Sequence, residues 1–261
     1  MVALVAALTV ISYAFPANPP VAYDVEFQFK GFIPVLGGRD GDADVKLGFE
    51  VAGATADADG NPRVTCDLKA FKLLFGDAEM PFTLEQVKEV FPKNASSITP
   101  QGKVLKNDTP DVDIPFRLPG VDVKKMPDLT FLPIEFPTEG VEIGKEWTFK
   151  KTFAGADVSY TAKVTELDDA HAEVELKLSQ SYDTLEDEAK KVVKSEQEAV
   201  SRVHTDMTGT GKVTFDRKLG IVRSCTLESH SVAHVVDIQN KKESERKLDM
   251  TVRTTLRKEG L

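Results

Sequence analysis

Apolar and polar residues alternate along much of this chain, from about residue 23 to residue 256. One uninterrupted example runs through Ala172, Glu173, Val174, Glu175, Leu176, Lys177, Leu178 and Ser179. Because successive side chains of a β-strand point to opposite faces, this pattern predicts strands with one buried face and one wet face. Such strands are typical of antiparallel sheets, since parallel sheets buried on both faces have continuous apolar runs. We therefore expect a mostly β protein.

The size and charge of the chain narrow its class. It has 261 residues, of which 41% are hydrophobic and 29% charged, and its formal net charge is −9. This composition is ordinary for a folded protein with one large β domain or two modest ones. Nucleic acids and anionic membranes are bound by concentrated Lys and Arg, which an acidic chain does not offer in general. We expect no nucleic-acid partner.

The N-terminus resembles an export signal. Residues 1–15 are uncharged and mostly apolar, and the proline-rich stretch 16–20 follows them. The run is too short to cross a bilayer comfortably, and the small side chains of Ser12 and Ala14 favour cleavage after residue 14. We expect an exported protein, periplasmic or extracellular, with no transmembrane segment once mature. A buried N-terminal strand is the alternative, because no positive residue precedes the apolar run.

The first half of the chain has the predicted order β-β-β-α-β. Its strands are expected near 23–29, 43–52 and 63–75, and its helix over 83–91. The helix starts at a capping box, in which the Thr83 hydroxyl accepts from the amide of Gln86 and the Gln86 side chain returns to the amide of Thr83. A Gly-Lys-Val stretch at 102–104 then opens the next strand.

The second half repeats this order. Strands are expected near 144–149, 157–166 and 171–181, followed by a helix over 184–203 with an intermittent apolar stripe and several i,i+4 ion pairs. The shared order suggests an ancient duplication. The fold expected from it is a curved antiparallel sheet or half-barrel, built from two β-β-β-α-β repeats with two helical insertions.

Four segments follow from this division: a signal peptide at 1–14, a first β-rich repeat at 15–109, a proline-rich connection at 110–140 and a second β-rich repeat at 141–261. The connection keeps many apolar side chains, among them Leu129, Phe131, Leu132, Ile134 and Phe136. Disordered linkers lack such content, so we expect an ordered segment with edge strands. Whether one continuous sheet or two domains result is left open.

Two cysteines, Cys66 and Cys225, share strand faces with mostly apolar residues. Both could therefore point inward. In an oxidising compartment they could form a disulfide bond, whereas the alternative is a pair of reduced thiols in the core. The sequence does not decide between the two, because bonding requires Cα atoms within about 7 Å.

The sequence offers no catalytic or metal site. The acidic loops 40–44 and 57–61 lack the Gly and Glu of a calcium-binding EF-hand and are better explained as hairpin turns. His230 and His234 share a strand face about 13 Å apart, too far to hold one metal ion. No nucleophile elbow, phosphate loop, dinucleotide motif or Cys-x-x-Cys occurs. We expect no cofactor and no enzymatic activity.

The apolar faces of the strands suggest binding instead. The residues expected to line a ligand cavity are Trp147, Phe149, Tyr160, Ala162 and Val164. Lys151 lies on the same predicted face, where a strand bulge or a side chain reaching out to water would accommodate it. The alternative is that these residues simply anchor a filled core.

Several stretches of the second half resemble an uncharacterised family of exported bacterial β-sheet proteins. They are residues 132–137, 141–147, 211–216 and 220–222. The element order is also distantly similar to the half-barrel lipoprotein carriers of the LolA and LppX kind, in which a curved sheet holds an acyl chain under a helical lid. The resemblance implies a cell-envelope protein that binds a hydrophobic or lipid-like ligand under the helices at 83–91 and 184–203. The alternative is a structural or protein-interaction module with a filled core, and a hydrolase is less favoured.

Overall fold

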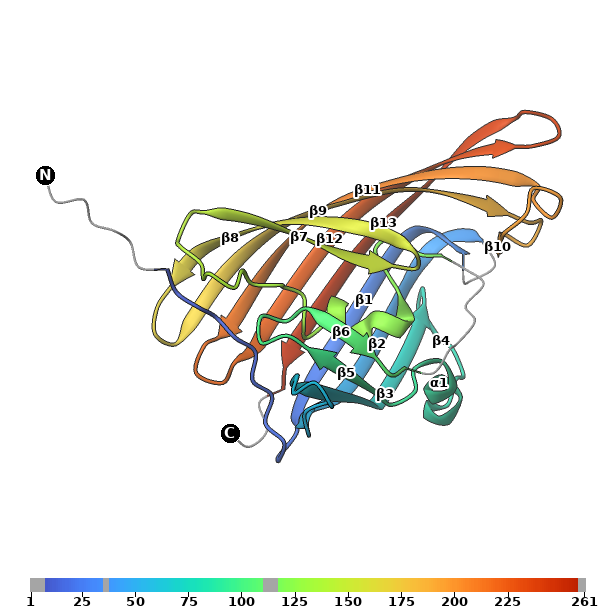
Figure 1. The fold of residues 1–261 in the computed structure, drawn as a ribbon. Helices are drawn as coiled ribbons and strands as arrows, with labels where there is room; N and C mark the ends of the chain where they lie inside the picture. Colours follow the sequence, from blue (N-terminus) through green and yellow to red (C-terminus); the bar gives the residue numbers. More distant parts are fainter. Residues whose placement is uncertain (1–7, 35–37, 110–116, 258–261) are drawn as a thin grey trace, which may run out of the picture.

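A computed structural model of the protein describes residues 8–34, 38–109 and 117–257. Within these residues, thirteen strands form one antiparallel sheet (Figure 1). The strands are β1 (Val21–Ile33), β2 (Arg39–Ala54), β3 (Arg63–Phe75), β4 (Ala78–Glu79), β5 (Asn94–Ile98), β6 (Val104–Asn107), β7 (Glu146–Phe153), β8 (Ala156–Leu167), β9 (His171–Glu186), β10 (Val192–Val193), β11 (Ser201–Asp216), β12 (Ile221–Asp237) and β13 (Glu243–Leu256). The short helices are α1 (Leu84–Val90), the 3₁₀ helix η2 (Val123–Lys125) and α2 (Met126–Leu129). The predicted mostly β, antiparallel fold is confirmed.

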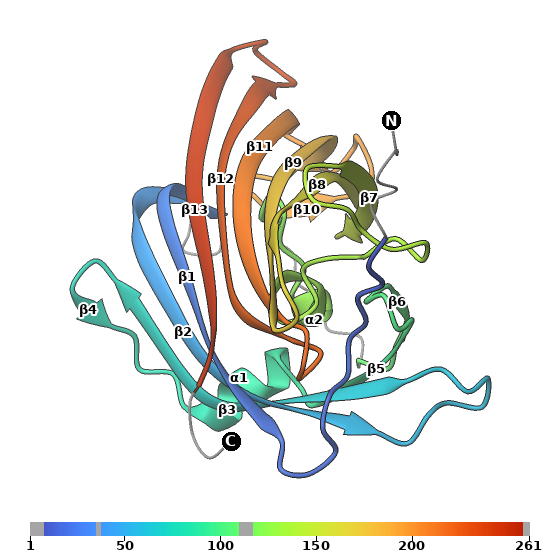
Figure 2. The same cartoon turned by 90° about the vertical axis from the view of Figure 1, so that its left-hand side faces the viewer.

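The strand order explains the shape of the molecule. It runs β6-β5-β3-β2-β1-β13-β12-β11-β9-β8-β7, with β4 added to β3 and β10 added to β9. The first and last strands therefore pair at the middle of the sheet, and β6 and β7 form its two edges. These edges are consecutive in the chain, so the connection between them has to cross the open side of the curved sheet. Figure 2 shows α2, which belongs to this connection, inside the concave side.

Residues 117–137, which we call the plug, fill much of the concave side. Their buried side chains include Leu129, Phe131, Leu132, Ile134 and Phe136, all part of the main hydrophobic core. The proline-rich connection is thus ordered where it is described, although residues 110–116 lie outside the described part. The edge strands expected there are absent from residues 117–140, which hold η2, α2 and one isolated bridge between Leu118 and Val121. Proline accounts for this, because it lacks the amide donor that a sheet ladder needs.

Polar contacts fix the plug to the sheet. The ammonium of Lys151 on β7 lies 2.7 Å from a carboxylate oxygen of Asp128 and donates to the carbonyl of Leu132 at 2.6 Å. The side chains of this pair are only 2% and 8% exposed. The indole of Trp147 donates to the carbonyl of Glu135 at 2.9 Å. The inward lysine is therefore satisfied by a buried ion pair, not by the bulge or the outward-reaching side chain expected from the sequence.

The N-terminal segment also belongs to the fold. Residues 1–7 lie outside the described part, but Thr9 pairs with Val141 and both Ile11 and Tyr13 are buried. The Tyr13 hydroxyl donates to the carbonyl of Ile134 at 3.2 Å. Cleavage after Ala14 would remove these contacts from the core. The geometry thus favours the alternative of a buried N-terminal segment, while export itself stays a prediction.

The helix predicted over residues 184–203 is wrong. Strand β9 continues to Glu186, and β11 begins at Ser201. Between them the carboxylate of Asp187 accepts from the amides of Ala189 and Lys191, both at 2.9 Å. An aspartate that bonds its own neighbouring amides favours a turn over a helix, and the β-branched valines nearby favour strands. The second half therefore does not share the helix-containing order predicted for both halves.

The helix predicted over 83–91 is confirmed as α1. Its N-cap, Thr83, accepts from the amide of Gln86, and the Gln86 side chain accepts from the amide of Thr83 at 2.9 Å. This helix packs against β3. The two predicted helices do not together form a lid, because residues 184–203 supply none and the plug occupies the concave side instead.

The cysteines are free thiols, so of the two alternatives that the sequence left open the structure has the reduced pair in the core and not the disulfide bond between Cys66 and Cys225. Both are buried, as expected, but Cys66 lies on β3 and Cys225 on β12. Strands β2, β1 and β13 separate them, which amounts to roughly 19 Å along the sheet at about 4.8 Å per strand. Burial raises the pKa of the Cys225 thiol to about 12 and raises that of Cys66 as well. Both thiols are therefore protonated and unreactive near neutral pH.

The buried ion pair gives a first stability test. Replacing Lys151 with Met should lower the free energy of unfolding by about 3–5 kcal/mol, because Asp128 would become a buried carboxylate without its cation. The neighbouring Lys150 has a side chain that is 67% exposed, so Lys150→Met should change stability by no more than about 0.5 kcal/mol. Urea unfolding of the two variants measures both values. Equal losses would contradict the anchoring role of Lys151.

Glycine substitutions test the packing of the N-terminal segment. Gly102 and Gly60 both have positive φ, at 93° and 82°, so alanine strains the backbone at either position. At Gly102 the added Cβ would also collide with the Tyr13 ring and lie 2.7 Å from the carbonyl oxygen of Ile134, whereas at Gly60 nothing lies within 4 Å. We expect Gly102→Ala to cost about 1–3 kcal/mol more than Gly60→Ala. Thermal unfolding that gives the same loss for both would show that Tyr13 does not pack as described.

Candidate functional site

The concave face changes character along its strands. On β9 the inward residues Ala172 to Leu178 are apolar, but the inward residues further along are polar: Gln180, Tyr182, Thr184 and Glu186. The plug spans the apolar part, from contacts with Phe215 at one end to a hydrogen bond from the amide of Gly120 to Gln180 at the other. The polar part beyond Gln180 is where the concave face holds a cavity.

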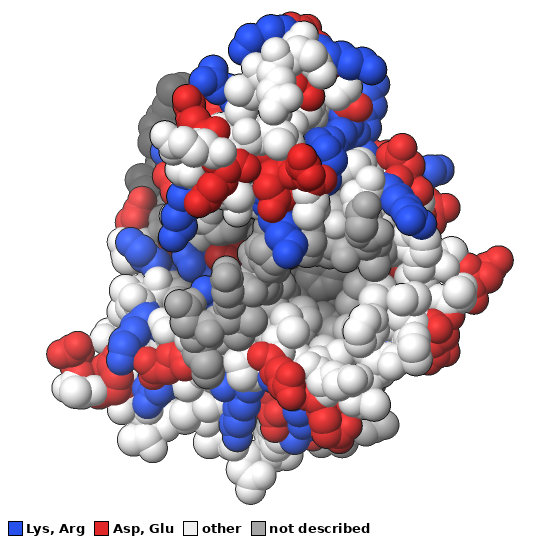
Figure 3. Space-filling model, turned by 90° about the vertical axis from the view of Figure 1, so that its right-hand side faces the viewer, with Lys and Arg blue, Asp and Glu red and all other residues white. Residues whose placement is uncertain are grey.

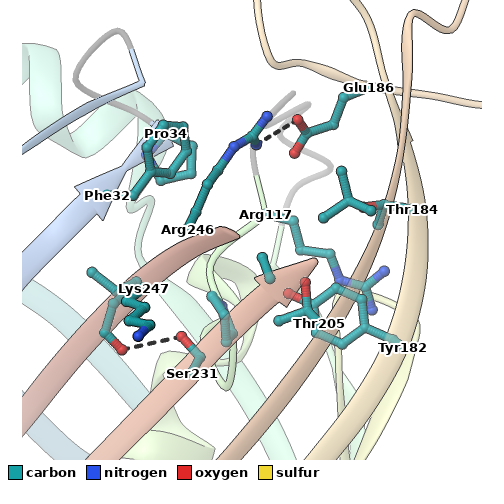
Figure 4. Close-up of a pocket in the computed structure, with 14 residues that line it drawn as sticks. Phe32, Pro34, Arg117, Tyr182, Thr184, Glu186, Thr205, Ser231, Arg246 and Lys247 are labelled. Carbon is teal, nitrogen blue, oxygen red and sulfur yellow. Dashed lines mark hydrogen bonds and ion pairs between the residues drawn. The ribbon is translucent and has the colours of Figure 1, made fainter. Parts of the chain in front are cut away.

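Cross-strand rows build the floor of this cavity. Tyr182, Thr205, Ala233 and Arg246 are direct partners across β9, β11, β12 and β13. The end of β1 supplies Phe32, and Pro34 follows it. Residue Arg117 enters from the start of the plug. We call this space the cationic cavity, and its volume is about 40 Å³ (Figure 4).

An ion pair closes one side of the cationic cavity. The guanidinium of Arg246 lies 2.6 Å from a carboxylate oxygen of Glu186, and the two side chains are 12% and 10% exposed. The guanidinium also lies over the Phe32 ring, 4.5 Å from its centroid. Strands β11 and β12 separate β13 from β9, so this pair bridges the curved sheet across its concave side. Figure 4 shows Arg246 reaching Glu186, with Arg117 and Tyr182 below them.

Arg117 is the unusual group of the site. Its guanidinium lies 3.9 Å from the centroid of the Tyr182 ring, a cation–π contact. Its Nη2 atom is buried and has no hydrogen-bond partner among the described residues. Burial lowers the pKa of Arg117, but an arginine stays charged at physiological pH. The cavity therefore holds a cation with an unused hydrogen-bond donor.

A larger groove shares Arg117, Thr184 and Val203 with the cationic cavity. Its other residues on β9, β11 and β12, such as Leu185, His204 and Val236, alternate with the inward residues, so most of the groove lies on the outer face of the sheet. Its volume is about 460 Å³, within the range of small-molecule sites. Its apolar lining includes Leu185, Val192, Val193 and Val236, and we call it the valine groove. Figure 3 shows that this side of the molecule is hollowed, with Lys, Arg, Asp and Glu gathered above the hollow.

The residues predicted to line a ligand cavity lie elsewhere. Tyr160, Ala162 and Val164 are buried in the core, and Trp147 and Phe149 are partly buried. Phe149 stacks on Tyr160 at 4.8 Å between ring centroids, and Trp147 contacts Phe136 of the plug. Neither the cationic cavity nor the valine groove is lined by any of the five, as far as the described residues show. A ligand would reach them only if the plug moved, so their role in binding stays a prediction.

Sequence reasoning missed Arg117 and Arg246. The signal that could have found the site is the period-two pattern of β9, which continues past Leu178 with polar residues at the inward positions. A polar stretch on an otherwise apolar strand face indicates that this part of the interior is not a hydrophobic core. The stretch was missed because residues 171–181 were predicted as a strand and residues 184–203 as a helix, which divided it.

Other kinds of site find no support in the described chain. Across residues 8–34, 38–109 and 117–257, no group of three or more His, Cys, Asp or Glu residues could hold a metal ion. Within the same ranges, every helix is too short or too polar to cross a membrane.

Comparison with known proteins finds a similar fold but no sequence family. No family model and no curated protein matches the sequence, so the resemblance to an exported bacterial family stays a prediction. The fold resembles that of lipovitellin. The similar structure concerns lipid–protein interactions in lipovitellin, with a TM-score of 0.52 and 11% identity. The match covers 94% of this chain and 25% of the lipovitellin chain, so this chain spans about a quarter of that protein.

His204, which lines the valine groove, gives a test of the local electrostatics. Its Nδ1 atom lies 2.8 Å from a carboxylate oxygen of Asp183, and its Nε2 atom lies 3.3 Å from one of Asp206. The hydrogen bond to Asp183 is the main reason that the pKa of His204 is raised above 6.5. The folded state thus holds this proton more tightly than the unfolded state, which stabilises the fold below about pH 6.5 and is lost as pH rises through the folded pKa.

An NMR titration of the His204 ring should therefore show a midpoint above 6.5. In Asp183→Asn the midpoint should fall, because the carboxylate that accepts the hydrogen bond is gone. Asp249→Asn, which removes the carboxylate beside His230, serves as the control and should leave the His204 midpoint unchanged. An unchanged midpoint in Asp183→Asn would show that the contact does not exist in solution.

Proposed function

We propose that the protein binds a hydrophobic, lipid-like ligand at the open end of its curved sheet, and that it does so without catalysis. The observation that carries this proposal is the valine groove, a space of about 460 Å³ in which aliphatic side chains such as Leu185 and Val236 lie among polar ones such as Asp183 and His204. Contact between the hydrocarbon of a ligand and the aliphatic side chains of the groove removes apolar surface from water, which is favourable.

The comparison with lipovitellin supports the same proposal. Both chains contain a similar large sheet, and the lipovitellin structure concerns interactions with lipid. At 11% identity the similarity extends to the fold alone. The proposal therefore depends on the groove of this chain and takes from lipovitellin only the observation that such a sheet is compatible with lipid.

A second candidate is a structural or protein-interaction module. The plug favours it, because Leu129, Phe131, Leu132 and Ile134 already fill the concave face where the sequence predicted a ligand. The two candidates differ in one respect. A carrier needs an apolar space open to a ligand, and a purely structural module does not.

Calorimetric titration of the full chain with oleate decides between them. We expect saturable binding at micromolar concentrations, and Val236→Gln should weaken it about tenfold by replacing apolar contact area with an amide. The control is Val232→Gln, because Val232 is equally half-buried on the same face of β12 but lines neither the cationic cavity nor the valine groove. Absence of saturable binding to the unmodified protein would leave the structural module as the better interpretation.

A further inference from the structure

We propose that the cationic cavity is a second binding site, separate from the valine groove, which takes the carboxylate group of a small molecule and binds it through Arg117. The valine groove lies mostly on the outer face of the sheet, whereas the cationic cavity lies on the concave face. The inference therefore goes beyond the proposed function and does not depend on it.

The charged groups of the cavity leave one cation without an anion. Among the described residues that line the cavity, Glu186 is the carboxylate, and Arg246 pairs with it at 2.6 Å. The side chain of Lys247 alternates to the other face of β13, where its ammonium is mostly exposed and lies 4.0 Å from Glu245. Arg117 remains, so the cavity has an excess of positive charge in a protein whose net charge is −9.

One acid acts on Arg117 without pairing with it. Burial lowers the pKa of Arg117, and the charge of Asp122 opposes this only in part. The two carboxylate oxygens of Asp122 accept instead from the amides of Lys124 and Ala154, at 3.0 and 2.9 Å. Across the described part of the chain, no carboxylate lies within ion-pair distance of Arg117.

The hydrogen bonding of Arg117 also favours an anion. A buried donor that has given up water and found no acceptor is unfavourable, and native proteins rarely leave one without a reason. The Nη2 atom of Arg117 is such a donor among the described residues. A carboxylate oxygen would supply the missing acceptor.

The surroundings of Arg117 fix its position. The Tyr182 ring lies 3.9 Å from the guanidinium, and Tyr182 is paired with Thr205 of β11. The plug also bonds to β9 close by in the sequence, through the amide of Gly120 and the Gln180 side chain at 2.9 Å. A cation held in this way loses little freedom when it binds an anion, which favours affinity.

The size of the cavity favours a carboxylate over a phosphate group. A volume of about 40 Å³ holds roughly three water-sized atoms. A carboxylate consists of one carbon and two oxygens and is planar, like the guanidinium, whereas a phosphate is tetrahedral and larger. The hydroxyl groups of Thr184, Thr205 and Tyr182 line the same cavity and offer further donors (Figure 4).

The experiment compares acetate with acetamide, which has nearly the same shape but no charge. Both are titrated into the full protein at constant ionic strength and pH 7, with the tyrosine rings labelled for NMR. Acetate should shift the Tyr182 ring signals saturably, and acetamide should bind roughly 10- to 150-fold more weakly, the range for losing a hydrogen bond between charged groups. Tyr13, Tyr23 and Tyr160 are buried in the core away from the cavity lining, so their signals should not move.

Variants assign the response to Arg117. Arg117→Gln should abolish the saturable shift with acetate, and Arg117→Lys, which keeps the charge but loses the planar donor pair, should weaken it. The matched control is Arg253→Gln, because Arg253 lies on the outer face of β13 and already pairs with Glu26 at 3.7 Å. This control should respond to acetate as the unmodified protein does. A loss equal to that of Arg117→Gln would overturn the assignment.

The comparison of acetate with acetamide needs no variant, so it tests the inference even if Arg117→Gln fails to fold. Equal responses to the two ligands, or no saturable shift of the Tyr182 signals, would overturn it. Inorganic phosphate that binds more tightly than acetate would overturn the choice of a carboxylate. None of these results bears on the valine groove, because binding of oleyl alcohol, which has no carboxylate, tests the proposed function separately.

Discussion

The apolar concave face of an open sheet has to be covered, and in this protein the chain covers it with its own proline-rich connection. The need arises from the strand order, in which β1 pairs with β13 and leaves β6 and β7 as edges. The buried contact of Lys151 with Asp128 and the carbonyl of Leu132 then fixes the plug to an edge strand. An ion pair this deeply buried is costly to form, and moving the plug away from β7 would leave a buried charge without its partner.

The position of the plug determines where a ligand can bind. Where the plug lies, from Gly120 to Phe136, an acyl chain would have to displace well-packed side chains such as Phe131. Beyond Gln180 the inward face becomes polar, and the open space lies there. The same connection both fills the apolar end of the sheet and supplies Arg117 to the open end. One segment therefore both fills the core and contributes to the candidate site.

Local patterns in the sequence predicted local structure well. The alternation located most strands, and the capping box at Thr83 located α1, because both signals depend on side chains close in sequence. The helix over 184–203 failed because i,i+4 charge pairs also occur by chance, while Asp187 bonds its own neighbours in a turn. The candidate site could not be predicted in this way, because it depends on pairing between strands that are far apart in the sequence. That Arg246 meets Glu186, and that Cys66 lies far from Cys225, both follow from the pairing of β1 with β13, which no local pattern encodes.

Proline in the connection links these observations. A connection of this length with normal strand-forming residues could have paired with β6 or β7 and extended the sheet toward closure. Residues such as Pro119, Pro127 and Pro133 lack the amide hydrogen that such pairing requires, so the segment turns inward and satisfies its polar groups through side chains. Gln180, Lys151 and Trp147 provide three of those partners. The sheet thus stays open, and only the first residues of the plug, among them Arg117 and Pro119, reach the polar end of its concave face.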